Sequence, residues 1–356
     1  MKVAIDISPL KSGHQFRGIG SYTKNLIEEM QLIKADDFSV KLVENGQTPK
    51  DCDLTHYPYF DLFFLTLPLV KTLPIIVTVH DVIPLIFPKR FPPGIKGKAK
   101  FQIQKFSLKS VKAILTDSQV SKDDIVNYLD FPRQKIFVVP LAPGKEFKKL
   151  KVESEKGSLR EIPSELKVKK KYRLPDNFIL YVGDVNYHKN IPGLIKAFSK
   201  LDRSFNLVLV GKAFGEGDLK ETGQMVQLIK SLNLDDRVMR LGWVFQNDLP
   251  AIYNLANVYC QPSFYEGFGL PVLEAMACGV PVVAAKVASL PEIAGKAGVL
   301  VDPYDIDSIA RGIKEAVANR NELIRKGLVQ AKRFNWKKTA RQTFQVYKKV
   351  FEECQK

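Results

Sequence analysis

The sequence lacks the features that mark membrane-spanning, secreted and disulfide-rich proteins. No run approaches the roughly 18 apolar residues that a spanning helix needs, and Asp6 interrupts the N-terminal apolar stretch before a secretory signal could form. The few cysteines lie far apart, with no C-x-x-C pair, at Cys52, Cys260, Cys278 and Cys354. The sequence therefore predicts neither a disulfide framework nor a zinc site, and it favours a chain that folds in the cytosol.

Acidic residues are scarce relative to basic ones. Against 38 Asp and Glu stand 54 Lys and Arg, a net charge of +16 that favours contact with anionic lipid, nucleic acid or phosphorylated substrates. No acid occurs between Asp81 and Asp117, whereas cations occur at Lys89, Arg90, Lys96, Lys98, Lys100, Lys105, Lys109 and Lys112. Apolar residues interleave with them at Phe91, Ile95, Phe101, Ile103, Phe106 and Leu108. This basic amphipathic segment is either a solvated helix over a core or a surface for an anionic membrane.

Short β-branched runs alternate with segments of helical spacing, which is typical of parallel sheets flanked by helices. We expect strands in the first half at 2–8, 38–44, 52–57, 74–80, 113–118 and 135–140. In the second half we expect them at 178–184, 205–211, 236–242, 256–262, 280–285 and 298–303. At about 150 residues per domain, the pattern predicts an α/β fold of two Rossmann-like, doubly wound domains that face a central cleft.

Composition suggests the domain boundaries. Residues 151–173 are rich in charge and lack strand periodicity, so we interpret them as a linker between domains at 1–150 and 174–335. A last helix within 336–356 has an apolar stripe that needs a partner surface, and we expect it to return to the first domain. The stripe consists of Trp336, Ala340, Phe344, Tyr347 and Phe351.

The stretch 256–285 predicts, in order, a strand, a glycine-containing loop, a helix and a second strand. Pro271 suits a first helical turn and Gly279 suits a left-handed helix stop, so we expect a helix over 270–278. The N-terminus of this helix points at whatever the preceding loop holds.

The loop before this helix can hold a diphosphate. Gly267 and Gly269 let the backbone approach an anion closely, and the N–H groups of Phe268, Gly269 and Leu270 add to the positive end of the helix dipole. The sequence therefore predicts a pyrophosphate cradle without a P-loop lysine.

Two carboxylates frame this cradle. Glu274, in the helix, can accept hydrogen bonds from both hydroxyls of a ribose, and Glu266, just ahead of the glycines, can bind sugar hydroxyls. Taken singly, Glu274 could merely complement the helix dipole and Glu266 could be solvated. The complete arrangement of glycines, helix and carboxylates favours the binding interpretation.

This E-x7-E pattern followed by G-V-P-V-V resembles the retaining glycosyltransferases of the GT-B fold, specifically glycosyltransferase family 4, also called group 1. The resemblance covers nearly the whole chain. It implies that 181–198 is the first strand and phosphate-binding loop of a donor domain, where Lys189 contacts the nucleotide diphosphate. Relatives commonly have Arg where His188 stands, and some have Arg at Asp184, so one diphosphate cation is missing or replaced.

The first half fits the same family. Gly18 and Gly20 lie at a turn before a helix, similar to the family's glycine loop near the acceptor and diphosphate. His80 follows a strand, and the resemblance implies that it lies beside the transferred sugar, although a lone histidine is more often structural. Ser118 is expected to cap a helix rather than to catalyse.

One motif points elsewhere. Asp51 and Asp53 form a D-x-D, the metal-binding signature of the other glycosyltransferase fold, but they open a predicted strand. The helix dipole and Lys189 can do the work of a metal ion. We therefore expect no metal site and no cofactor.

Together these features predict a retaining hexosyltransferase, mannosyltransferase-like, with an N-terminal acceptor domain and a C-terminal nucleotide-sugar domain. It would move a sugar from a nucleotide diphosphate sugar, with GDP-mannose favoured, to a hydroxyl of a glycan or lipid-linked acceptor in polysaccharide biosynthesis. The candidate catalytic residues are His80, Lys189 and Glu266. The candidate donor-binding residues are Gly18, Gly20, Gly183, His188, Lys189, Glu266, Gly267, Phe268, Gly269, Leu270 and Glu274.

Other classes of protein stay open at this point. An epimerase or phosphorylase acting on nucleotide sugars could share the fold, and a non-catalytic basic protein could bind membrane or nucleic acid. For the enzyme we expect a cytoplasmic location, peripheral to the inner face of the cell membrane if the basic segment binds lipid. Nucleic acid is not an expected partner of that enzyme.

Overall fold

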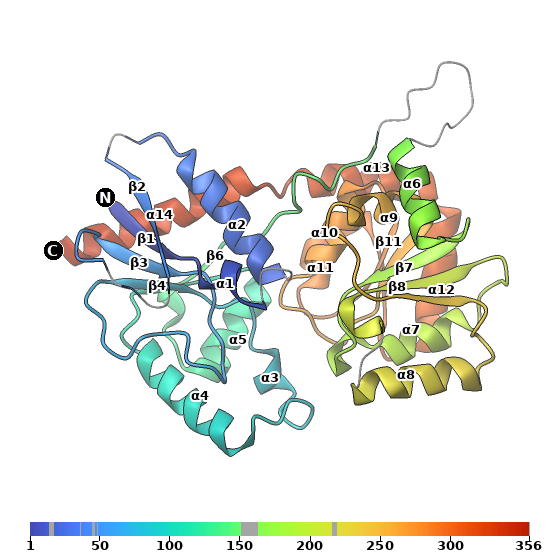
Figure 1. The fold of residues 1–356 in the computed structure, drawn as a ribbon, viewed down its shortest axis with the longest axis horizontal. Helices are drawn as coiled ribbons and strands as arrows, with labels where there is room; N and C mark the ends of the chain where they lie inside the picture. The colour runs from blue at the N-terminus through green and yellow to red at the C-terminus, as the bar shows by residue number, and fades with distance from the viewer. Residues whose placement is uncertain are drawn as a thin grey trace. The chain divides into compact units, whose positions relative to one another are not determined.

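The computed structural model describes residues 1–13, 18–35, 37–44, 47, 49–150, 163–215 and 219–355, which form two compact units (Figure 1). Unit 1 comprises Met1–Ala142 and Phe334–Lys356, and unit 2 comprises Pro143–Arg333. Each contains one six-stranded sheet in which every described pairing is parallel. The predicted α/β class is confirmed.

The sheet of unit 1 has the order β2-β1-β3-β4-β5-β6. Its strands are β1 (Lys2–Asp6), β2 (Ser39–Val43), β3 (Leu54–Tyr57), β4 (Ile75–Thr78), β5 (Ala113–Thr116) and β6 (Ile136–Val138). Its helices are α1 (Ser8–Lys11), α2 (Gly18–Gln31), α3 (Ile83–Ile86), α4 (Gly94–Leu108), α5 (Gln119–Leu129) and α14 (Trp336–Gln355), with a 3-10 turn, η2 (Arg133–Lys135). All six strands lie within the segments that the sequence predicts.

The sheet of unit 2 has the order β12-β11-β10-β7-β8-β9. Its strands are β7 (Phe178–Val182), β8 (Asn206–Val210), β9 (Val238–Leu241), β10 (Val258–Gln261), β11 (Val282–Ala285) and β12 (Val299–Val301), again within the predicted segments. Its helices are α6 (Pro163–Tyr172), α7 (Ile191–Phe198), α8 (Lys220–Ser231), α9 (Leu249–Leu255), α10 (Leu270–Ala277), α11 (Leu290–Ala294), α12 (Ile306–Ala318) and α13 (Arg320–Ala331). Its 3-10 turns are η3 (Tyr187–Lys189), η4 (Lys212–Phe214) and η5 (Gly295–Ala297).

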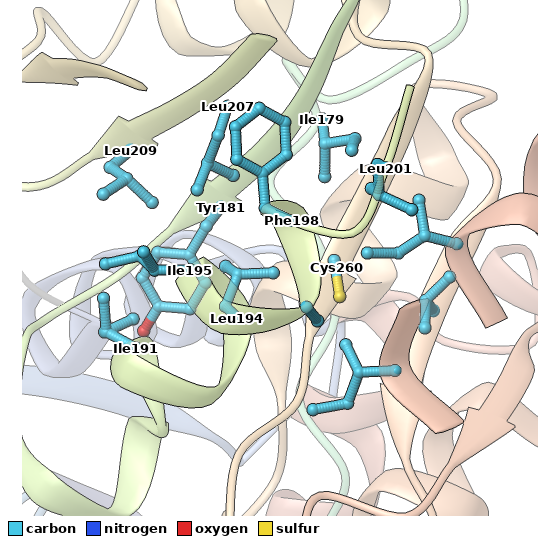
Figure 2. Close-up of a cluster of buried hydrophobic side chains, with 14 of the residues drawn as sticks. Ile179, Tyr181, Ile191, Leu194, Ile195, Phe198, Leu201, Leu207, Leu209 and Cys260 are labelled. Carbon is cyan, nitrogen blue, oxygen red and sulfur yellow. The ribbon is translucent and has the colours of Figure 1, made fainter. Parts of the chain in front are cut away.

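The core of unit 2 fixes the start of α7. This helix buries side chains spaced three and four residues apart, and Figure 2 shows them against strand residues such as Tyr181 and Leu207. Burying a large aliphatic or aromatic side chain fully contributes roughly 1.5–3 kcal/mol. Four such side chains hold α7 in place: Ile191, Leu194, Ile195 and Phe198. The residues directly before α7 are therefore held firmly at the carboxyl edge of the sheet.

The structure differs from the predicted linker. Unit 1 gives way to unit 2 after Ala142 rather than at 150, and residues 163–172 form α6, which packs on α9 within unit 2. The charge that suggested a linker lies partly on the outer side of α6, where Lys167 and Lys170 are exposed. The rest of the predicted linker, 151–162, lies outside the described residues.

Helix α14 belongs to unit 1 and packs on α2 (Figure 1). Trp336, Ala340 and Tyr347 are buried as predicted. Phe344 and Phe351 are only partly buried. Other buried α14 side chains are Thr339, Thr343, Val346 and Val350. Among the helices of the described ranges, none combines the length and the apolar character needed to cross a bilayer.

A buried chain of hydrogen bonds joins α14 to the sheet of unit 1. The Tyr347 hydroxyl lies 2.6 Å from Nδ1 of His56, and Nε2 of His56 lies 2.8 Å from Oγ1 of Thr78. The Tyr22 hydroxyl of α2 lies 2.9 Å from the same Thr78 oxygen. Burial lowers the pKa of His56 to about 3, so this histidine is neutral near pH 7. The chain links α14, β3, β4 and α2.

Candidate active site

Three loops at the carboxyl edge of the second sheet meet at Asn190. This residue has φ +54° and caps α7, since its Oδ1 accepts a hydrogen bond from the Gly193 N–H at 3.2 Å. Its Nδ2 donates to the carbonyl oxygens of Pro262 at 3.0 Å and Pro303 at 2.8 Å. One side chain therefore ties together the loops that follow β7, β10 and β12.

Lys189 and Glu266 form a buried ion pair in these loops. The Lys189 Nζ lies 2.8 Å from both carboxylate oxygens of Glu266, whose side chain is 7% exposed. Gln261 Nε2 and Ser263 Oγ each donate to Glu266 Oε1 at 2.7 Å. Burial opposes ionisation of Glu266, but the Lys189 charge and these donors outweigh it, so its pKa is lowered. Glu266 is therefore an anion whose Oε1 accepts three hydrogen bonds and whose Oε2 accepts one, from Lys189.

Helix α10 begins directly after the glycines that the sequence singles out. Gly269 has φ +102°, and a Cβ added there would lie 2.6 Å from Leu290 Cδ2, so only glycine fits. The Ser289 hydroxyl lies 2.8 Å from the carbonyl oxygens of both Glu266 and Phe268, which fixes the loop path. The predicted helix is confirmed to within one residue, and Gly279 takes the predicted left-handed stop with φ +71°.

Glu274 lies on α10 in a largely apolar setting. The Tyr253 hydroxyl donates to its Oε2 at 3.1 Å. Burial, with a smaller contribution from Glu146, raises the pKa of Glu274 to about 7. This carboxyl group therefore changes its charge within the physiological pH range.

The predicted basic pair before α7 has only one charged member. His188 is buried, and burial together with the neighbouring Lys189 lowers its pKa to about 4, so the imidazole is neutral at pH 7. Gly183 continues the sheet beyond β7, with its N–H donating to the Val210 carbonyl at 2.9 Å. The Asp184 carboxylate accepts a hydrogen bond from the Val185 N–H at 2.8 Å, so this side chain points back toward the backbone of its own loop. Lys189 is the cation of this segment.

In unit 1, His80 pairs with Asp117. Strands β4 and β5 are parallel neighbours, so the residues after them lie at one edge of the sheet, and His80 Nδ1 is 2.7 Å from Asp117 Oδ2. The Tyr22 ring packs edge-on against the imidazole with 4.8 Å between centroids. Burial opposes protonation of His80, but the Asp117 carboxylate outweighs it and raises the pKa of His80.

Comparison with known proteins decides the family. Residues 164–343 match the family described as glycosyl transferases group 1, and residues 39–142 match glycosyltransferase family 4. The chain belongs to the group 1 glycosyltransferases. The family match therefore favours a glycosyltransferase over the epimerase, phosphorylase and non-catalytic alternatives.

Several relatives of this glycosyltransferase are named as mannosyltransferases. O-antigen chain mannosyltransferase B of Escherichia coli is 34% identical over 77% of this chain and 70% of its own length. O-antigen chain mannosyltransferase RfbU of Salmonella typhimurium is 31% identical over 70% of this chain and 62% of its own length. The serotype-specific mannosyltransferase WbdA of Escherichia coli is 30% identical over 73% of this chain, but the match covers only 32% of WbdA.

Solved structures show the same fold. Sucrose-phosphate synthase from Thermosynechococcus elongatus superposes with a TM-score of 0.76 over 99% of this chain and all of that one, at 21% identity. HepE from Anabaena, in complex with UDP and glucose, gives 0.73 over 98% of this chain and all of that one, at 17% identity. The predicted GT-B fold of this glycosyltransferase is confirmed.

The structure corrects the predicted glycine loop of the glycosyltransferase. Gly18 and Gly20 do not form a turn before the helix, because both lie in the first turn of α2. Residues 14–17, just ahead, lie outside the described residues. Gly20 is buried, so a small residue suits close packing there. Ser118, by contrast, caps α5 as predicted, with its Oγ accepting from the Ser121 N–H at 3.0 Å.

The D-x-D carboxylates contact neighbouring strands. Asp51 is 2.5 Å from the Lys2 Nζ and 2.8 Å from the Lys41 Nζ, and Asp53 Oδ2 accepts from the Lys2 N–H at 2.6 Å. These contacts join the start of β3 to β1 and β2.

Sequence reasoning missed four residues whose side chains hydrogen-bond to His80 or Glu266 in the structure. They are Asp117, Gln261, Ser263 and Ser289. A signal existed for Asp117, because it follows β5 just as His80 follows the neighbouring strand. Gln261 and Ser263 lie five and three residues before Glu266, so their contacts are local, whereas Ser289 reaches Glu266 from another loop, which spacing along the chain does not reveal.

Proposed function

We propose that this glycosyltransferase moves a mannosyl group from GDP-mannose to a hydroxyl of a glycan or lipid-linked acceptor, with retention of anomeric configuration. The observation that carries the donor site is the Lys189–Glu266 pair beside the N-terminus of α10. The mannosyltransferase names of several relatives support the choice of sugar.

In this proposal the diphosphate lies between Lys189 and the start of α10. The anion competes with Glu266 for the Lys189 ammonium, and the N–H groups at Phe268 to Leu270 add the positive end of a helix dipole. Glu274 binds the ribose hydroxyls from the same helix. Negative charge grows on the diphosphate as the glycosidic bond breaks, so these groups stabilise the transition state more than the ground state.

We propose a same-face displacement rather than a covalent intermediate on Glu266. Gln261 and Ser263 both donate to Glu266 Oε1, so these two contacts hold the carboxylate in place as a binding group even when Lys189 turns to the diphosphate. In the same-face route the bond from the anomeric carbon to the phosphate oxygen breaks. The acceptor oxygen bonds to that carbon from the same face, and its proton passes to the departing phosphate.

His80 is proposed to contact the transferred sugar. Asp117 holds the Nδ1 side of the imidazole, so a contact with a substrate hydroxyl would use the Nε2 atom, which is buried in this structure and must be uncovered when the sugar binds. Asp117 then acts as a positioning residue, since it reaches the substrate only through His80.

The first prediction tests donor and stereochemistry. GDP-mannose should raise the melting temperature of the protein more than UDP-glucose at equal concentration, because specific binding stabilises the folded state. With a mannose-terminated oligosaccharide carrying an alkyl chain, proton NMR should show an α-linked mannosyl product. A β-linked product would overturn retention, and transfer from UDP-glucose alone would overturn the donor.

A second prediction concerns pH. Ionised Glu274 accepts hydrogen bonds from a ribose more strongly than the neutral acid, and its pKa is about 7. We therefore expect the affinity for GDP to increase by roughly 10-fold between pH 6 and pH 8, because the ionised fraction increases over that range.

The matched control is Glu274→Gln, measured by titration calorimetry at the same pH values. The variant should bind GDP with lower affinity, and it should retain only the pH dependence that the GDP phosphates themselves produce. An identical pH slope in both proteins would remove Glu274 from the ribose site.

A further inference from the structure

Helix α4 presents apolar side chains to solvent. Ile95, Ala99, Gln102 and Phe106 lie on one helical face, and all four are exposed, with Ile95 at 88% and Phe106 at 69%. The buried residues of α4 are Gly97, Gln104, Ser107 and Leu108, of which only Leu108 has a large apolar side chain. A surface helix of a globular protein normally has the opposite arrangement. The outward apolar face is therefore a feature that the packing of unit 1 does not explain.

Two inward-facing polar side chains of α4 hold a loop that exposes further apolar side chains. Gln104 Nε2 donates to Thr66 Oγ1 at 2.7 Å, and Ser107 Oγ donates to the Pro68 carbonyl at 2.7 Å. The loop so held exposes four large apolar side chains: Phe64 at 64%, Leu65 at 57%, Leu69 at 60% and Val70 at 80%. We call these four residues, together with Ile95, Ile103 and Phe106, the α4 surface.

The charged residues within α4 are all basic. Lys96, Lys98 and Lys109 are exposed on α4, and the Lys100 Nζ lies 4.9 Å from the centre of the Phe64 ring. The loop acid, Asp61, turns back to accept from the N–H groups of Phe63 and Phe64 and from the Tyr59 hydroxyl.

One of the basic residues is already engaged. Lys105 pairs with Asp130 of unit 1, so it adds little to the field around the surface. The cations that remain exposed there flank the apolar residues.

We propose that the α4 surface docks on an anionic membrane, with its apolar side chains in the acyl boundary and its lysines at the head groups. Contiguous exposed apolar side chains mark interaction sites, and flanking cations match an anionic lipid interface. A second copy of this chain would set like charges against each other. Nucleic acid would leave Ile95, Phe106 and Val70 without an apolar partner.

The test is cosedimentation with liposomes of 60:40 phosphatidylcholine to phosphatidylglycerol, against phosphatidylcholine alone. Two double variants separate the contributions: Lys98→Glu with Lys109→Glu, and Ile95→Gln with Phe106→Gln. Each should lower the partition coefficient onto anionic liposomes at least 10-fold. High salt should weaken wild-type binding, and the apolar variant should bind even less at each salt concentration.

Matched controls change exposed residues elsewhere. Lys337→Glu with Lys338→Glu, on α14, removes the same charge, and Val329→Gln, on α13, removes an apolar side chain that is 64% exposed. Both should bind like wild type. Circular dichroism should show that all variants are folded, and transfer to a water-soluble acceptor should stay unchanged.

Three outcomes would overturn the proposal. They are equal binding to neutral and anionic liposomes, no binding to either, and equal losses in variants and controls. Because the assay needs no sugar donor, its failure would leave the proposed transferase activity standing.

Discussion

Lys189→Ala should lower kcat by roughly 10²–10³-fold, as expected when one group that stabilises developing charge is removed. The Lys189 Nζ contacts both oxygens of Glu266 and, in the proposed mechanism, passes to the departing diphosphate. The effect should appear in steady-state kinetics with GDP-mannose. Lys196→Ala, which removes an exposed lysine from α7, is the matched control and should behave like wild type.

Measuring the free energy of unfolding beside the activity distinguishes a chemical role of Lys189 from a structural one. Lys189→Ala leaves Glu266 as a buried charge without its cation, which typically costs about 3–5 kcal/mol. Adding Glu266→Gln removes that charge, so the double variant should regain much of the lost stability while its activity stays low. If the double variant also regained activity, Lys189 would be only the structural partner of Glu266.

Asp117→Asn should lower kcat/KM by about 10–100-fold, because His80 would lose the partner that orients it toward the transferred sugar, and one charge-assisted hydrogen bond contributes about 1.5–3 kcal/mol. The substituted amide would keep the shape of the pair but lose the negative charge that raises the pKa of His80. The protonated imidazole would then persist only to lower pH. The limb of the kcat/KM profile that reports His80 should therefore move to lower pH in the variant.

The control for this prediction is Asp123→Asn, which changes a surface carboxylate of α5 that pairs with Arg133. It should leave both rate and pH profile unchanged. An Asp117→Asn profile that keeps its midpoint, even at a reduced rate, would show that Asp117 supports the fold without tuning His80.

Much of the fold could be predicted because its signals are local. β-branched runs mark strands that are buried on both faces, and Pro271 and Gly279 mark the ends of α10 by their own backbone preferences. The glycine signal was less specific at Gly18 and Gly20, since a glycine pair serves equally as a turn or as a small-residue face at a helix start. Nothing local distinguishes these two cases.

The contacts within the candidate site could not be predicted in the same way. Asn190 and Ser289 acquire their roles because separate loops meet. Which face of α4 points to solvent could not be predicted from the sequence either. Apolar residues occur on both sides of this helix, and only the loop bonded to Gln104 and Ser107 turns Ile95 and Phe106 outward.

The hydrogen-bonded chain from Tyr347 to Tyr22 also has a consequence for biosynthesis. Unit 2 is one continuous stretch of polypeptide, so it can fold as soon as it leaves the ribosome. Unit 1 begins to emerge earlier, but His56 has its Tyr347 partner only after α14 has been translated. Until then, the buried face that α14 covers is open to water and to chaperones. The unit that the ribosome starts first is therefore the last to be completed.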